Sequence, residues 1–471
     1  MSHSLLLLTT CLLLSQASLA QDPLTAAFTR DVAPVLEAYC TGCHGGEKTK
    51  GDVDLTSIRS LSDALEHPVL LEDILAQIDD GEMPPDDERQ PTTAEKTRLT
   101  AWIRAALDSG DDTDDPGRTT VRRLNKTEYR NTVRDLFGVD FNPGRGFPAD
   151  GSGGAGFDNT ADALFLPPVL MEKYLAAAGG LLEQVFASDK LARPLLTPAP
   201  SPGRLTPENA AGAILERFLS RAFRRPVSDE EIARYRSLAD TALDRGDTFP
   251  DALKLSLKAA LVSPHFLFRI EITPPGTSSP YAVPPFELAS RLSYFLWSSM
   301  PDAGLFSAAG DGTLTQPPIL AAQVDRMLAD PKVTALSHNF AAQWLGFDEL
   351  IDKVQPDGKR FPMFTPDVRA AMYREGTLFF HHMVSENRPL TDLVDADYTF
   401  INAPLARIYD IPGITGNAMR KVTLTEQSNR GGVLTMGGVL AATSLPLRTS
   451  PVVRGRWVLE DIIGDPPPPP P

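Results

Sequence analysis

Cysteine is scarce in this chain of 471 residues, which holds only three, at positions 11, 40 and 43. The first lies in an N-terminal segment that we expect to be removed, so the mature chain keeps two. Two cysteines in a chain of this length exclude the disulfide-rich framework of small secreted domains. The length itself favours about three domains, because a single hydrophobic core stops growing at roughly 250 to 300 residues.

Basic residues are outnumbered by acidic ones. The chain has 45 Lys and Arg against 61 Asp and Glu, a formal net charge of −16 and a pI near 4.9. Such a field repels phosphate backbones, so we expect no nucleic-acid partner. The same charge can steer a basic partner protein toward the surface, although its commoner effect is to keep a protein soluble.

The apolar run at the N-terminus is short. Residues 5–16 read LLLLTTCLLLSQ, too few to span a bilayer, and Ala17-Ser18-Leu19-Ala20 offers the small residues that a signal peptidase recognises. No Lys or Arg precedes the run, but residues 1–20 are still predicted to be a secretory signal peptide. We therefore expect a periplasmic or otherwise exported protein, and membrane association is not required.

Familiar catalytic motifs are missing as well. Neither G-x-S-x-G nor H-E-x-x-H occurs, and the glycine-rich stretch 144–157 holds no Gly-Lys-Ser/Thr and no G-x-G-x-x-G after a strand. His381 and His382 are adjacent, so on a helix they point about 100° apart and cannot form a metal pair. Other polar residues are interpreted as structural or solvated: His265, the acidic cluster Asp395, Asp397 and Tyr398, and the cations Arg221, Arg224 and Arg225 at a helix end. Catalytic residues are therefore not assigned.

The two retained cysteines stand in Cys40-Thr41-Gly42-Cys43-His44. This spacing lets both thiols add to the vinyl groups of one haem, while the adjacent histidine binds the iron. A zinc site would need two more ligands, but no further cysteine remains and the nearest other histidine is His67. A thioredoxin-like pair would stand in a βαβ unit, which the surrounding sequence does not predict. We interpret the motif as the covalent attachment site of a single haem c.

Amphipathic helices are predicted on both sides of the motif. Upstream, Pro34 is expected to open or kink the last turns. Downstream, Thr92 and Glu95 have the spacing of a capping box. The apolar stripes that could cover a haem are Phe28, Val32, Val35, Leu36 and Tyr39 before the motif and Leu99, Trp102, Ile103, Ala106 and Leu107 after it.

Met83 is the candidate for the second axial ligand of the iron. It stands in Gly81-Glu82-Met83-Pro84-Pro85, where two prolines stiffen a loop between predicted helices. A thioether is a soft, neutral ligand that raises the potential of a low-spin electron carrier. The alternatives are that Met83 only packs the loop, or that His67 is the ligand; His67 precedes Pro68 at a predicted helix start and is interpreted as a surface or packing residue.

With these motifs, residues 21–110 resemble a small class I cytochrome c domain of the type found in large exported planctomycete proteins. The resemblance implies that Cys40 and Cys43 carry the two thioether bonds to the haem. It also implies that His44 is the proximal ligand and Met83 the distal one.

The rest of the chain is predicted to be mainly α, because helical periodicity prevails and strand alternation is scarce. The acidic run DSGDDTDDP, residues 108–116, contains no apolar residue and marks a boundary, and four prolines between positions 194 and 202 mark another. The predicted segments are a haem domain at 21–110, an acidic linker at 111–120, a helical domain with a glycine-rich loop at 121–188, a proline-rich linker at 189–206, helical domains at 207–272 and 284–412, and a partial domain at 420–471.

Stretches such as RRLNKTEYRNTVRDLFGVDF, LSRAFRRPVSDEEIARY and ELASRLSYFLWSSMPD resemble the series of uncharacterised domains that follows the cytochrome in those planctomycete proteins. In that family the chain continues beyond the proline run, usually with another C-x-x-C-H, whereas this sequence stops at Pro466–Pro471. We therefore expect a truncated chain. The resemblance implies no substrate.

Electron transfer through one His/Met-ligated haem, to a redox partner protein not identified by the sequence, is the function that these residues favour. Two alternatives stay open. In one, the helical region is an oxidoreductase that passes electrons to the haem, so its substrate would reduce the haem in the whole protein but not in residues 21–110 alone. In the other, the protein is a structural or binding protein with an accessory cytochrome domain.

Overall fold

The computed structural model describes residues 22–45, 48–111, 121–142, 146–151, 156–274 and 280–467. The chain forms two compact units, an N-terminal unit up to Gly117 and a C-terminal unit from Arg118 on. Several predicted features lie outside the described residues: the signal peptide with Cys11, most of the acidic linker, parts of the glycine-rich stretch and the last four prolines.

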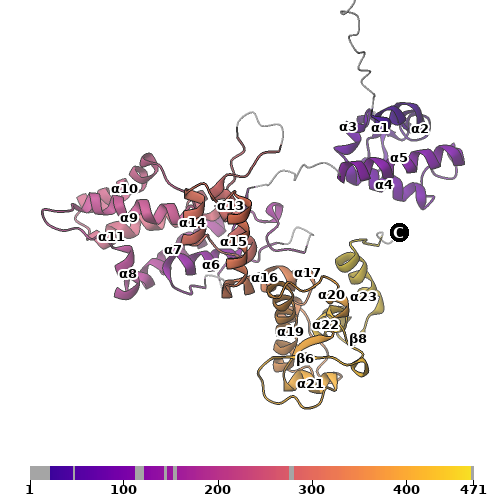
Figure 1. Ribbon diagram of the computed structural model, residues 1–471. Coiled ribbons are helices and arrows are strands. Elements are labelled where there is room, and N and C mark those ends of the chain that lie inside the picture. Colours follow the sequence, from indigo (N-terminus) through magenta and orange to yellow (C-terminus); the bar gives the residue numbers. More distant parts are fainter. Residues whose placement is uncertain are drawn as a thin grey trace, which may run out of the picture. The chain divides into compact units, whose positions relative to one another are not determined.

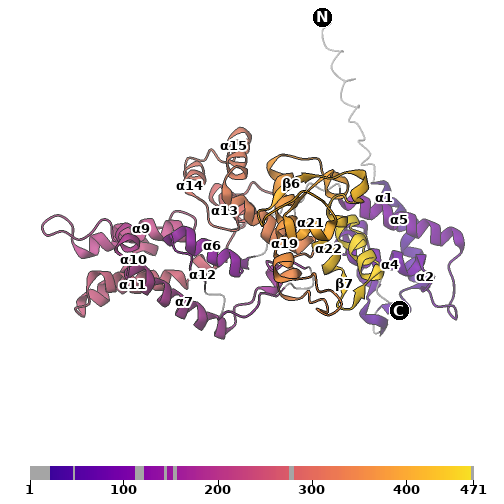
Figure 2. The same ribbon diagram turned by 90° about the horizontal axis from the view of Figure 1, so that it is seen from below.

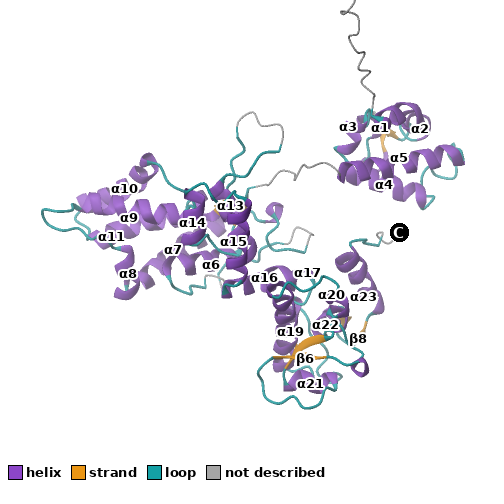
Figure 3. Ribbon diagram, viewed as in Figure 1, coloured by secondary structure: helices purple, strands orange, loops and turns teal. Residues whose placement is uncertain are grey.

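Helices dominate both units, and each strand belongs to a small two-stranded sheet (Figure 3). The predicted mainly α fold class is therefore confirmed. Among the described residues, no helix combines the length and the apolar character needed to cross a bilayer.

The N-terminal unit consists of helices around one core (Figure 1). The two predicted apolar stripes meet there: Phe28, Val32 and Leu36 are at most 5% exposed, and so are Leu99 and Ile103. Its helices are α1 (Pro23–Ala27), the π-helical segment η1 (Phe28–Val32), α2 (Ala33–Tyr39), α3 (Leu61–Leu65), α4 (Pro68–Asp79) and α5 (Thr93–Asp111), and its strands are β1 (His44–Gly45) and β2 (Lys48–Thr49).

Pro34 explains why the helical hydrogen-bond pattern is π-helical just before α2. Proline has no N–H to donate to the carbonyl four residues earlier. The chain takes a π-helical turn just before it, and the N–H of Ala33 donates to the carbonyl of Phe28. The predicted disturbance at Pro34 is thus present, and the helix continues through it to Tyr39.

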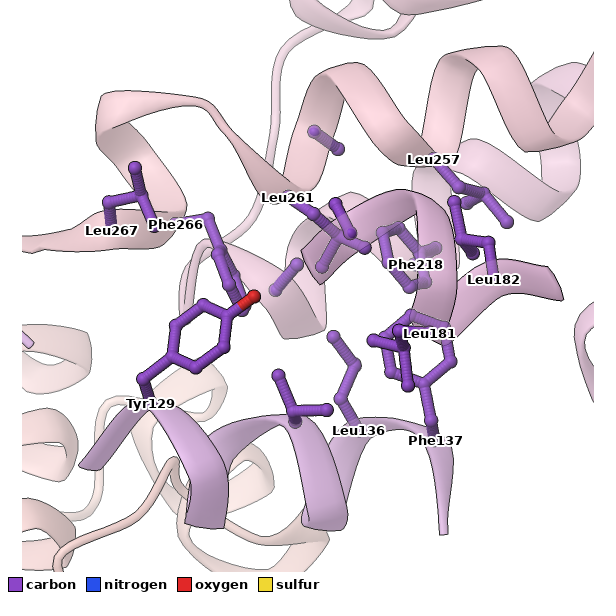
Figure 4. Close-up of a cluster of buried hydrophobic side chains, with 14 of the residues drawn as sticks. Tyr129, Leu136, Phe137, Leu181, Leu182, Phe218, Leu257, Leu261, Phe266 and Leu267 are labelled. Atoms are coloured by element: carbon purple, nitrogen blue, oxygen red, sulfur yellow. The ribbon is translucent and has the colours of Figure 1, made fainter. Parts of the chain in front are cut away.

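The first part of the C-terminal unit packs its helices into one large core, of which Figure 4 shows the centre. Helices α9, α10 and α11 lie side by side in both Figure 1 and Figure 2. The elements are β3 (Arg122–Arg123), α6 (Lys126–Phe137), α7 (Pro168–Phe186), α8 (Asp189–Leu195), α9 (Pro207–Ala222), α10 (Asp229–Asp244), α11 (Phe249–Leu261), α12 (Pro264–Leu267) and β4 (Phe268–Arg269).

The second part of the C-terminal unit has two further cores, one around Trp297 and one around Phe379. Its longer helices are α13 (Pro285–Trp297), α14 (Ala303–Gly310), α15 (Pro317–Leu328) and α19 (Pro366–Ser385). The shorter elements are α16 (Thr334–Leu336), α17 (Ala342–Trp344), α18 (Glu349–Asp352), α20 (Asp392–Asp395), β5 (Tyr398–Ile401), α21 (Ala403–Tyr409), β6 (Arg420–Thr423), α22 (Gly437–Ala442), β7 (Ser444–Leu445), β8 (Arg448–Thr449) and α23 (Pro451–Trp457).

The predicted segments of the C-terminal unit pack against one another. Residues 121–188 and 207–272, predicted as separate domains, share one core and are tied by the pairing of β3 with β4. The predicted linker between them begins with α8, whose Ala192 is buried. Likewise Val433, Met436 and Val439, assigned to a separate partial domain, pack into the core around Phe379. In both places, the helices of one segment leave an apolar face that only the other segment covers.

Charge is distributed unequally between the two units. Residues 1–117 contain 22 acidic and 8 basic residues, a net charge of −14, whereas residues 118–471 contain 39 acidic and 37 basic residues, a net charge of −2. Nearly all of the net negative charge of the chain therefore belongs to the N-terminal unit.

Candidate haem-binding site

The attachment motif begins where α2 ends. Cys40 is the C-cap of this helix, and its N–H donates to the carbonyl of Leu36 at 2.9 Å. The next turn is held by the carbonyl of Cys40, which accepts from the N–H groups of Cys43 at 3.1 Å and His44 at 2.9 Å. The two thiols and the imidazole therefore belong to one hydrogen-bonded turn.

The histidine ring is fixed by a backbone carbonyl. His44 Nδ1 lies 2.9 Å from the carbonyl oxygen of Lys50, and strand β1, which contains His44, pairs with β2. A carbonyl oxygen only accepts, so Nδ1 must carry the proton. In the neutral ring Nε2 then keeps its lone pair, which is how a second partner prepares a histidine to bind a metal.

Both cysteines are unpaired and half-buried. Burial raises the pKa of the Cys40 thiol to about 11, so its sulfur stays protonated at neutral pH. A structural zinc site needs four ligands, and no group of three His, Cys, Asp or Glu side chains within the described ranges could hold a metal ion. The donor set thus fits thioether attachment of a haem better than a zinc site.

Met83 lies on the loop between α4 and α5, with a half-buried side chain next to buried Pro84. Its N–H donates to the carbonyl of Gln77 at 3.0 Å. The side-chain amide of Gln90 donates to the carbonyls of Pro84 at 2.9 Å and Pro85 at 2.8 Å. The loop is therefore held at both ends, as the two prolines predict.

Tyr39 connects this loop to the attachment turn. It directly precedes Cys40, and the guanidinium carbon of Arg89, from the Met83 loop, lies 4.9 Å from the centre of its ring. The Tyr39 hydroxyl also donates to Glu95 at 3.3 Å. Glu95 in turn caps α5 together with Thr92, which confirms the predicted capping box.

The competing ligand, His67, is exposed at the N-cap of α4 and is followed by Pro68 as the first helical residue. This confirms its interpretation as a surface residue at a helix start.

His382, the second histidine of the adjacent pair, has structural partners. His382 lies 2.8 Å from the Lys421 amino group and packs edge-on against Tyr398. Burial, and then the charge of Lys421, lowers the pKa of His382. Tyr398 donates to Asp392 at 3.0 Å rather than to the neighbouring acidic residues of the predicted cluster.

Two buried charged residues were not predicted. Arg224, interpreted as a solvated cation, is 4% exposed and donates to the carbonyls of His265, Phe266 and Phe268 at 2.7 to 3.2 Å. It tethers the segment after α9 to α12 and β4. The only sequence signal is its place beside the apolar residues Ala222 and Phe223.

The second is Glu375 on α19, which is 1% exposed. It accepts from the hydroxyls of Thr399 at 2.6 Å and Tyr409 at 2.5 Å, and the Tyr409 oxygen accepts from the N–H of Gly437 at 2.6 Å. Burial raises the pKa of Glu375 to about 7. A glutamate among the apolar residues Ala371, Met372 and Phe379 of one helix was the available signal.

Together, the helical fold and the attachment turn define the N-terminal unit as a cytochrome-type haem domain. Comparison with known families agrees, since residues 40–87 match Planctomycete cytochrome C. The C-terminal unit matches four families described as proteins of unknown function: DUF1587 at residues 122–187, DUF1595 at 210–271, DUF1592 at 283–411 and DUF1588 at 430–471.

The chain therefore belongs to the proteins in which a planctomycete cytochrome c domain precedes a series of domains of unknown function. The cytochrome domain implies haem c binding. No curated protein and no solved structure matches the chain.

Proposed function

We propose that this protein is an exported electron carrier that binds one haem c covalently through Cys40 and Cys43, with His44 and Met83 as the axial ligands. When bound, haem c supplies one-electron chemistry. The observation that carries the proposal is the hydrogen bond between His44 Nδ1 and the Lys50 carbonyl, because it leaves Nε2 available as the ligand atom.

Met83 is the only methionine between residues 22 and 111. Its loop is held by Gln77 and Gln90 and connected through Arg89 to the turn that carries the cysteines. These contacts support Met83 over His67, which is exposed. A histidine and a methionine occupying both axial positions leave no open position for a substrate, which favours electron transfer over substrate chemistry.

The partner that fits this unit is a cationic redox protein. The net charge of −14 on residues 1–117 would attract it over distances of about a Debye length, roughly 10 Å at 0.1 M salt. The rate of electron exchange with a basic cytochrome should therefore fall steeply as salt is added. A rate that is independent of salt would contradict this assignment of the partner.

The predicted signal peptide implies export. Export would bring the thiols of Cys40 and Cys43 to the compartment outside the cytoplasm in which haem c is attached. The mature protein is expected to begin at Gln21, which N-terminal sequencing of the exported protein would show. Its mass should exceed that of the polypeptide by one haem, and its reduced spectrum should be that of a low-spin c-type cytochrome. A mature polypeptide without covalent haem would end the proposal.

The distal ligand is tested by Met83→Ala. Removing the thioether should free the sixth position, lower the reduction potential and let the reduced protein bind carbon monoxide. His67→Ala is the matched control and should leave the spectrum unchanged. If Met83→Ala leaves the spectrum unchanged and His67→Ala alters it, the distal ligand is His67.

A further inference from the structure

A cavity of about 210 Å³ lies in the first part of the C-terminal unit, between α6, α8 and α9. Its floor is apolar: Leu136, Phe137 and Phe218 are at most 6% exposed, and Figure 4 shows them close together in the core. The rings of Phe137 and Phe218 are 5.6 Å apart. Leu191, Leu195 and Ile214 complete the apolar lining.

The rim of the cavity is cationic. Lys190 on α8 and Arg217 and Arg221 on α9 line it, and no carboxylate does. Within the described part of the chain, none of the three forms an ion pair. Arg217 and Arg221 are four residues apart on one helix, a spacing at which like charges destabilise the helix unless something neutralises them.

Both arginines are positioned by helix ends. One Nη2 donor of Arg217 reaches the carbonyl of Pro194, in the last turn of α8, at 3.0 Å. The Nη2 of Arg221 reaches the carbonyl of Asp135, in the last turn of α6, at 3.0 Å. A guanidinium has five N–H donors, so these anchors order the two side chains and use few of their donors.

Arg221 is exposed at the rim of the cavity, and its charge is only partly compensated by the protein. Partial burial, and to a lesser extent the neighbouring Arg217, lowers the pKa of Arg221, and Asp135 offsets this only in part. Asp135 is itself engaged by Arg134 and Lys332. An anion bound at the rim would supply the missing negative charge.

We propose that this cavity binds a compact organic anion, with a carboxylate at Arg217 and Arg221 and an apolar ring or branched chain over Phe137 and Phe218. A cavity of about 150 Å³ accommodates benzene, and sites for larger ligands measure about 300 to 1,000 Å³. The volume here therefore suits a ligand of the size of benzoate. Two ordered guanidinium groups match the planar carboxylate.

The test is calorimetric titration of the full-length protein with benzoate, compared with benzyl alcohol and inorganic phosphate. Benzoate should bind saturably, and both other probes should bind at least about tenfold more weakly, because each lacks either the charge or the ring. Arg217→Gln and Arg221→Gln should each lower benzoate affinity about tenfold. Arg193→Gln, which removes a charge from the same α8 outside the cavity lining, is the matched control and should not change it.

Arg217→Lys tests whether weaker binding by Arg217→Gln comes from the lost charge or from misfolding. The lysine keeps the positive charge, so this variant should bind benzoate more tightly than Arg217→Gln. Thermal unfolding of each variant without ligand shows whether it is folded. No saturable benzoate binding in the millimolar range would overturn the proposal, as would equal binding by wild type and both glutamine variants. Benzyl alcohol binding as tightly as benzoate would make this a neutral apolar cavity, and phosphate binding as tightly would make it a simple anion site; either result contradicts the proposed ligand class.

Discussion

In the N-terminal unit the described ion pairs lie at the surface, as in Arg104 with Asp79, whose side chains are 53% and 47% exposed. The C-terminal unit has exposed ion pairs too, as in Arg130 with Asp140, but it also has a buried one: the side chains of Arg123 and Asp150 are 4% and 6% exposed and 2.7 Å apart. The N-terminal unit, with a net charge of −14 on residues 1–117, keeps a strong negative field at its surface. The buried pair of the C-terminal unit uses charge to connect elements far apart in sequence, because a buried charge must find its partner.

The largest expected change in the free energy of unfolding comes from breaking the buried ion pair between Arg123 and Asp150. Asp150→Ala leaves Arg123 buried without its partner and should lower the free energy of unfolding of the C-terminal unit by about 3 to 5 kcal/mol. Asp79→Ala removes the exposed partner of Arg104 in the N-terminal unit and should cost at most about 1 kcal/mol. Denaturant unfolding, followed by probes for each unit, measures both. Equal costs would remove the distinction between the two units.

Glu375 gives the next largest effect, on the pH dependence of stability. Its pKa is raised from 4.5 to about 7 in the folded chain, so the folded state holds a proton that the unfolded state releases between these values. The stabilisation is complete below pH 4.5 and is lost as pH rises through 7, by about 3 kcal/mol in total.

Glu375→Gln should flatten this slope, because a neutral amide does not titrate. Its oxygen can accept the hydrogen bond of one of the two hydroxyls, and its NH2 group can donate to the oxygen of the other. The measurement is the unfolding midpoint of the C-terminal unit at pH 5 and pH 8, in wild type and variant. The transition of the N-terminal unit serves as the internal control and should be the same in both proteins. A variant with the wild-type slope would assign the pH dependence to other groups.

The smallest effect compares two capping boxes of the same design. Asn125 caps α6, is 3% exposed and also donates to Asp158 at 2.9 Å. Thr92 caps α5 at the surface. Asn125→Ala should cost about 2 kcal/mol and Thr92→Ala about 0.5 to 1 kcal/mol, because only the first leaves a buried partner unsatisfied. Thermal unfolding of each variant measures the difference, and a larger loss for Thr92→Ala would contradict it.

Local features of both units could be predicted from the sequence. The boxes at Thr92 and Asn125 follow from side chains that bond to nearby backbone, and the stripes around Phe28 and Leu99 follow from helical periodicity. The attachment motif needs only consecutive residues, so its turn was also foreseeable. The position of Met83 at the haem stays a prediction.

Long-range features could not be predicted in the same way. Periodicity shows that a helix has an apolar face, but not which distant helix covers it. The sequence therefore did not reveal that segments 121–188 and 207–272 share one core. Arg224 and Glu375 were missed for a related reason. Their partners are carbonyls and hydroxyls from other elements, and nothing near them in the sequence specifies those partners.

The short pairing of β3 with β4 has a consequence for how this part of the chain is made. Arg122 lies opposite Arg269, and the N–H of Leu124 donates to the carbonyl of Leu267 at 2.8 Å. The first and last residues of the segment 122–269 are therefore neighbours. During synthesis the first helices must wait for almost 150 further residues before that closure forms. Neighbouring ends also mean that the chain enters and leaves this core at one place, although Tyr294 and Met300, which follow the segment, pack into the same core.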